Sequence, residues 1–92
     1  MSSGPGEWSS FKQATPETQD IAEKVKKTAE EKAQMKFNVY KAIKYRTKVV
    51  AGIDFNIIVK ITEMSQNADM VVTRSLDDEF SLVSITFDVK PN

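Results

Sequence analysis

The segment Lys48-Val49-Val50-Ala51-Gly52 joins two runs in which apolar and polar residues alternate. One face of both runs falls on odd positions: Phe37, Val39, Ile43, Tyr45, Thr47 and Val49 before the junction, and Ile53, Phe55, Ile57, Val59 and Ile61 after it. Such period-two alternation is typical of β-strands. No glycine lies between Gly6 and Gly52, and a lone glycine in a strand pattern marks a turn or a close backbone approach. We therefore predict two long antiparallel strands joined by a hairpin whose tip lies near residues 50–52.

The tip of this hairpin is apolar, whereas hairpin turns usually carry Asn, Asp or Gly. In one interpretation the odd-numbered Val49 and Ala51 pack on the core of the chain itself. In the other, the even-numbered Val50 points outward to meet a partner. Composition alone leaves both interpretations open.

The length and charge of the chain restrict its class. Its 92 residues, 40% of them apolar, suit a single domain over 1–92 with one core. Lys+Arg and Asp+Glu are balanced at 13 each, so there is no basic excess of the kind that binds nucleic acid. No apolar run approaches the roughly 20 residues of a membrane span. We expect neither a nucleic-acid nor a membrane partner.

The chain has no histidine and no cysteine. Ser-His and Cys-His pairs, imidazole metal ligands and thiol nucleophiles are therefore excluded. We predict a protein that is not an enzyme and that uses neither a cofactor nor a metal. The polar N-terminus has no apolar signal region, and small extracellular domains without disulfides are uncommon, so we expect a cytoplasmic location.

A helix is predicted after an N-terminal segment, residues 1–13, that is rich in Gly, Pro and Ser. This segment is expected to be partly flexible, although its aromatic residues Trp8 and Phe11 favour docking of some of it on the domain. Thr15 followed by Pro16 is typical of an N-cap and a first helical residue. The helix should run to about 32–35, with an apolar stripe on Ile21, Val25, Ala29 and, at its end, Met35.

The remaining chain predicts two further strands. Residues 63–69 form a polar connection, 70–73 a strand and 75–80 a second hairpin loop, and the alternation of Val83, Ile85, Phe87 and Val89 indicates a last strand. The fold class is α+β, with one N-terminal helix packed across a four- to five-stranded antiparallel sheet, in which the chain before the helix supplies the fifth strand. Alternate hairpins of a meander lie at the same end of the sheet. Both loops, together with the chain before the helix, should therefore form one narrow edge.

These segments resemble the stefins, the type 1 cystatins, which are small inhibitors of papain-like cysteine proteases. The first loop matches the stefin pattern Gln-x-Val-x-Gly at Val50 and Gly52, and Gly6 stands at the family's distance before the helix. The resemblance also rests on the helix start Ala14-Thr15-Pro16-Glu17-Thr18-Gln19, on Tyr45-Arg46-Thr47-Lys48-Val49-Val50-Ala51-Gly52 and on Ser75-Leu76. It implies a cystatin-like fold over most of the chain.

The resemblance implies reversible, competitive inhibition of papain-like enzymes such as cathepsins. In this mechanism the N-terminal trunk, which is residues 1–13, and the two hairpin loops form a wedge. The wedge fills the protease cleft on both sides of the catalytic cysteine. The trunk turns away at Gly6 before it presents a bond for cleavage. The protease-binding residues that the resemblance implies are Pro5, Gly6, Lys48, Val49, Val50, Ala51, Gly52, Leu76 and Asp77.

Two departures from the family pattern support an alternative, a non-inhibitory interaction module on the same scaffold. Lys48 stands where the family usually has Gln, and Asp77, followed by Asp78 and Glu79, stands where many stefins have Pro. We interpret the three carboxylates as a solvated loop rather than a metal site. A monomer is expected, with a domain-swapped dimer as the alternative because long strands flank a strained loop.

Overall fold

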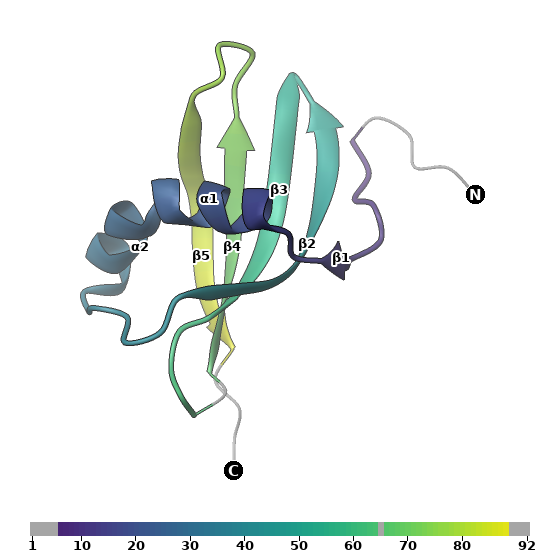
Figure 1. Ribbon diagram of the computed structural model, residues 1–92. Coiled ribbons are helices and arrows are strands. Elements are labelled where there is room, and N and C mark those ends of the chain that lie inside the picture. The colour runs from purple at the N-terminus through teal and green to yellow at the C-terminus, as the bar shows by residue number, and fades with distance from the viewer. Residues whose placement is uncertain (1–5, 65, 89–92) are drawn as a thin grey trace.

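The computed structural model describes residues 6–64 and 66–88, and in it two helices lie across one face of a five-stranded antiparallel sheet (Figure 1). The strands follow one another across the sheet in the order β1-β2-β3-β4-β5. The elements are β1 (Lys12–Gln13), α1 (Pro16–Lys24), α2 (Lys26–Ala33), β2 (Lys41–Val50), β3 (Gly52–Lys60), β4 (Asn67–Arg74) and β5 (Phe80–Asp88). The predicted α+β class and the predicted edge strand before the helix are confirmed. Neither helix in the described part of the chain is long and apolar enough to cross a membrane.

The helical segment begins where the sequence predicts but is divided in two. Thr15 and Thr18 form a capping box, in which the hydroxyl of each accepts the backbone N–H of the other at 3.2 Å, and Pro16 follows the cap. The prediction of one continuous helix is wrong, because Val25 leaves helical geometry at φ −110° and ψ 8°. The helix α1 packs on β2 and β3 while α2 packs on β5. The interruption therefore separates a helix that packs on β2 and β3 from a helix that packs on β5.

The core lies between the helices and the central strands. Ala22, Val25 and Ala29 are at most 3% exposed and belong to one core cluster with residues of β3 and β4. The largest fully buried side chains of this cluster are Ile57, Ile61, Met70, Val59 and Val72, of which Ile61 directly follows β3. The Tyr40 hydroxyl donates a hydrogen bond of 2.7 Å to the carbonyl oxygen of Ala22. Burial, together with the nearby carboxylates of Glu23 and Glu30, raises the pKa of the Tyr40 phenol above its usual range, which keeps this donor protonated.

Two apolar residues lie away from the core because β-bulges interrupt the alternation. Ile43, which the odd series places inward, is 40% exposed, since the pairing of β2 with β3 shifts between Ala42 and Lys44. Val83 is 57% exposed because the pairing of β4 with β5 skips it. Each bulge inserts one extra residue and turns it out of the pattern.

Further details of the strands and of the helical stripe differ from the predicted ones. The strand β4 begins at Asn67 rather than at residue 70, and β5 begins at Phe80 rather than at Val83. Met35 does not extend the apolar face of the helix, because α2 ends at Ala33 and Met35 is 44% exposed. Val89, the last member of the predicted strand, lies outside the described residues.

Candidate functional site

Three segments that are far apart in the sequence gather at one end of the sheet (Figure 1). The β2–β3 turn and the β4–β5 loop extend at this end, and the connection from β3 to β4 lies at the opposite one. The chain before the helix runs along β2 toward the same end, where the Gly6 N–H donates to the Val49 carbonyl oxygen at 2.8 Å. The narrow edge expected from the topology is therefore present. Among the predicted site residues, Pro5 lies outside the described part of the chain.

The β2–β3 turn presents apolar side chains to solvent. Val49 is 57% exposed and Val50 is 44% exposed, and Ala51 is exposed between them and Gly52. The interpretation in which the odd-numbered residues of the tip pack on the core is therefore wrong. Two exposed valines at the end of a rigid hairpin form an apolar tip that a partner can bury.

Gly52 brings the first turn against the base of the second loop. Its φ of +149° is a backbone conformation that residues with a side chain rarely adopt. A methyl group at this position would overlap the carbonyl oxygen of Arg74, the last residue of β4. Only glycine therefore allows the two hairpins to approach this closely.

The β4–β5 loop places a second apolar side chain beside the first turn. Leu76 is 83% exposed in this loop. Leu76, Val49 and Val50 all line one hollow of about 300 Å³ between the two loops. The two loops thus present three aliphatic side chains around one shallow depression.

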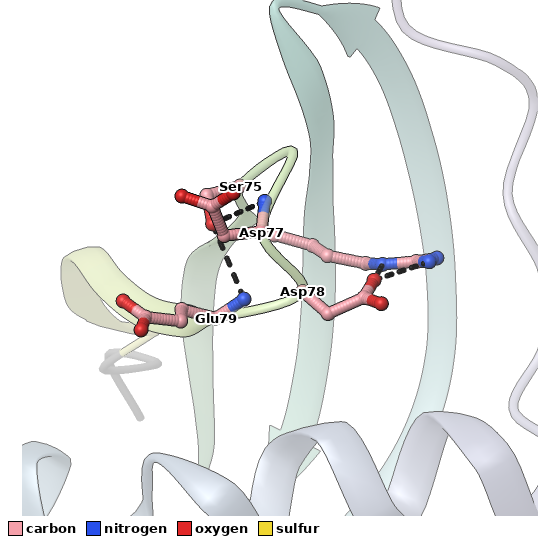
Figure 2. Close-up of polar contacts among 5 residues, drawn as sticks. Ser75, Asp77, Asp78 and Glu79 are labelled. Carbon is pink, nitrogen blue, oxygen red and sulfur yellow. Dashed lines mark hydrogen bonds and ion pairs between the residues drawn. The ribbon is translucent and has the colours of Figure 1, made fainter.

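The acidic residues of the second loop are held by contacts within the loop, as Figure 2 shows. The Asp78 carboxylate accepts a hydrogen bond of 2.7 Å from Arg74 Nε and lies 2.6 Å from Arg74 Nη2. The Ser75 hydroxyl accepts the backbone N–H groups of Asp77 and Glu79, each at 3.2 Å. The Asp77 and Glu79 carboxylates point away from that of Asp78. These contacts shape the loop on both sides of Asp77.

We expect the Arg74–Asp78 ion pair to contribute little to global stability. Its side chains are 43% and 71% exposed, and exposed pairs contribute about 0–1 kcal/mol. Asp78→Asn should lower the free energy of unfolding by no more than this amount, since Asn also accepts the positive φ of 64° at this position. Urea denaturation of Asp78→Asn, Arg74→Gln and the double variant measures the coupling, and a loss above about 2 kcal/mol would show that the pair supports more than its loop.

Lys48 does not project from the tip. Its Nζ atom lies 4.6 Å from the centroid of the Trp8 ring, and its side chain is half-buried. Lys48, one of the predicted site residues, thus contacts the N-terminal segment of its own chain. Arg74 has no role in the site predicted from the sequence, although its spacing of four residues from Asp78 across a hairpin loop is a signal for the pair.

Comparison with known proteins agrees with this geometry. The chain matches the Cystatin domain family over residues 6–79, a span that includes the described part of all three segments. The chain belongs to the cystatin family. Members of this family are inhibitors of cysteine proteases and not enzymes.

Similar proteins place the chain among the stefins, the type 1 cystatins. It is 41% identical to Stefin-C of Bos taurus over 81 residues, which cover 88% of this chain and 79% of that protein. It is 35% identical to Cystatin-A of Homo sapiens over 94 residues, covering 84% of this chain and 96% of that protein. A match of 46% identity to Cystatin-A of Felis catus covers 64% of this cystatin and 60% of the feline protein.

Proposed function

We propose that this cystatin is a reversible, competitive inhibitor of papain-like cysteine proteases of the cathepsin type. It would fill the active-site cleft with a wedge made of the trunk at Gly6, the β2–β3 turn at 48–52 and the β4–β5 loop at Leu76 and Asp77. The observation that carries the proposal is the convergence of these segments at one end of the sheet, with Val49, Val50 and Leu76 between 44% and 83% exposed.

The energetics of this edge support binding by occlusion. Burial of one aliphatic side chain against a partner contributes about 1.5–3 kcal/mol, and the edge offers Val49, Val50 and Leu76. The turn and the loop are already ordered by strand pairing, by the close contact at Gly52 and by the Ser75 hydrogen bonds. A preformed wedge loses little conformational entropy on binding.

The trunk supports reversibility. Gly6 has a φ of +84°, and its N–H is bonded to Val49, so the backbone follows the edge of the hairpin at this point. A chain held in this way can lie in a cleft without placing one of its peptide bonds in line with the nucleophile. The inhibitor would then leave the enzyme uncleaved.

Titration of papain with the full chain, followed by hydrolysis of a small peptide substrate, tests the proposal. We expect stoichiometric loss of activity that is competitive with substrate and is recovered on dilution. Absence of inhibition at micromolar protein, for papain and for a panel of cathepsins, would contradict it.

Gly6→Glu should weaken inhibition of enzymes with a narrow cleft. Among the described residues that are not its chain neighbours, no atom lies within 4 Å of the position of a Cβ at Gly6, so a glutamate there has room to project toward a partner. We expect the inhibition constant to rise roughly tenfold or more, since about 1.4 kcal/mol is lost for each factor of ten. Gly6→Ala is the matched control, because it shares the cost of positive φ but adds neither length nor charge. Equal constants for Gly6→Glu and the parent would remove the trunk from the site.

The alternative proposal is an interaction module that no longer inhibits. The observation that favours it is the acidic second loop, where Asp77 follows Leu76 and the Asp77 and Glu79 carboxylates point away from the Arg74–Asp78 pair. These two charges would enter the cleft with the loop. Binding to active-site-blocked papain separates the two proposals. An inhibitor binds free papain more tightly than blocked papain, whereas a module that uses another surface binds both equally.

We also propose that the free protein is a cytoplasmic monomer. This proposal is supported by membership of the stefins, by the polar N-terminus without an apolar signal region and by the absence of cysteine from the sequence. Cell fractionation tests the location. Light scattering after size-exclusion chromatography distinguishes a monomer from a domain-swapped dimer.

A further inference from the structure

Three cations lie in a row on the face of β2 that points away from the helices. Lys44, Arg46 and Lys48 alternate with residues whose partners on β3 belong to the core, such as Tyr45, which pairs with Ile57. Residues two apart on a strand are roughly 7 Å from each other, so three like charges in a row repel one another. On β3, Asp54 pairs with Lys48, whereas Lys44 and Arg46 pair with the uncharged residues Ile58 and Asn56.

Two aromatic rings of the N-terminal trunk alternate with these cations. The Trp8 ring centroid lies 4.6 Å from Lys48 Nζ and 5.1 Å from Arg46 Cζ. The Phe11 ring centroid lies 4.6 Å from Arg46 Cζ and 4.6 Å from Lys44 Nζ. The order along the strand is therefore cation, ring, cation, ring, cation. We call these five residues the cation–aromatic ladder.

The central cation of the ladder is fixed from the interior of the sheet. Arg46 Nε donates a hydrogen bond of 2.8 Å to Asn56 Oδ1. Asn56 is 2% exposed and its amide donates to the carbonyl oxygen of Met70 at 3.1 Å. A guanidinium oriented by a buried amide offers both of its faces to flanking rings without further loss of rotamer freedom.

Apart from the ladder, few main-chain hydrogen bonds hold the described part of the trunk on β2. The strand β1 has 2 residues, and from Gly6 to Phe11 the backbone donates to β2 at Gly6 and at Ser9, the latter to the Thr47 carbonyl oxygen at 2.8 Å. The Ser9 hydroxyl also accepts the Thr47 N–H at 3.1 Å. A strand pair this short is marginal, so side-chain contacts must supply much of the docking energy.

We infer that Trp8 and Phe11, stacked between Lys44, Arg46 and Lys48, are positioning residues that hold the trunk on β2 and place Gly6 beside the apolar turn before a protease is met. This inference rests on the proposed function. Only molecules with a docked trunk present the complete wedge, so the apparent dissociation constant rises as the docked fraction falls. Lys48, which departs from the family pattern, acts here through Trp8 on the trunk.

The test weakens the ladder without altering the wedge. The double variant Arg46→Gln, Phe11→Leu removes three of the four cation–ring contacts and leaves Trp8 and Lys48 in place. The side-chain amide that Arg46→Gln introduces can still donate to Asn56, so the sheet keeps its hydrogen bond. Phe11→Tyr retains the ring and serves as the conservative variant. Met64→Gln, at an 86% exposed position in the connection at the other end of the sheet, is the control.

Amide hydrogen exchange at Gly6 and Ser9, followed by NMR, measures docking in the free protein. We expect exchange to be roughly 10- to 100-fold faster in the double variant, the combined effect of three cation–π contacts, and within about threefold of the parent in Phe11→Tyr. All variants should still unfold in a single cooperative thermal transition, because the ladder lies outside the core. Unchanged exchange in the double variant would overturn the inference.

Papain inhibition by the same variants measures the consequence. We expect the inhibition constant to rise several-fold in the double variant and not in Phe11→Tyr or Met64→Gln. Faster exchange with an unchanged constant would overturn the positioning role and leave the inhibitor proposal intact. Failure of the parent itself to inhibit would overturn the proposed function, whereas the exchange rates would still decide whether the ladder docks the trunk.

Discussion

Gly52→Ala is expected to lower the free energy of unfolding by about 2–5 kcal/mol and to raise the inhibition constant at least roughly 30-fold. The added methyl group would overlap the Arg74 carbonyl oxygen, and the φ of +149° is strained for any residue with a side chain. Backbone strain of this kind costs about 1–3 kcal/mol, and overpacking costs a similar amount. Relief requires the first turn to move away from the second loop, which separates Val50 from Leu76. Loss of a central contact costs about 2 kcal/mol or more in binding, which is the stated factor.

Urea denaturation and papain titration check the two parts of this prediction. Gly6→Ala is the matched control, because Gly6 also has positive φ but no described residue other than its chain neighbours lies within 4 Å of its Cβ position. The control should lose less stability than Gly52→Ala. If Gly52→Ala unfolded at the same urea concentration as the parent, the two hairpins would not be in the contact described above.

The sequence was sufficient for the pairing of the strands and for the end at which the loops meet. Both depend on period-two alternation and on the order of hairpins, which are local properties. The positions that alternation misplaced, Ile43 and Val83, are the extra residues of β-bulges. A bulge depends on how two strands curve together, and no residue in either strand marks it in advance. Likewise, no sequence pattern marks Val25 in advance as the residue at which the helix breaks.

The resemblance to stefins predicted which segments form the candidate site. It did not predict the contacts between residues within the site. The resemblance supplies Gly6, the turn at 48–52 and Leu76, which the structure brings to one edge. It does not supply the contact of Trp8 with Lys48, because these residues are far apart in the sequence and meet only through the alignment of the trunk on β2. Nor does it supply the closeness of Gly52 to Arg74, which depends on the register of β3 with β4.

Val50→Asp is expected to raise the inhibition constant roughly 100- to 1,000-fold while leaving the protein folded. Val50 is 44% exposed in the free protein, so an aspartate there remains solvated and should change the free energy of unfolding by less than about 1 kcal/mol. In the complex the same carboxylate would be buried in the cleft without a partner. An uncompensated buried charge costs about 3–5 kcal/mol, which corresponds to the stated factor or more.

Val83→Asp separates this effect from a general effect of negative charge. It makes the same chemical change at a valine that is 57% exposed on β5, outside the two loops and the trunk. Papain titration should give a constant close to that of the parent for Val83→Asp and a large increase for Val50→Asp. Equal increases would mean that net charge, rather than burial of the tip, controls affinity. Unchanged inhibition by Val50→Asp would remove the first turn from the binding edge, because no buried aliphatic contact can accept an unpaired carboxylate without loss.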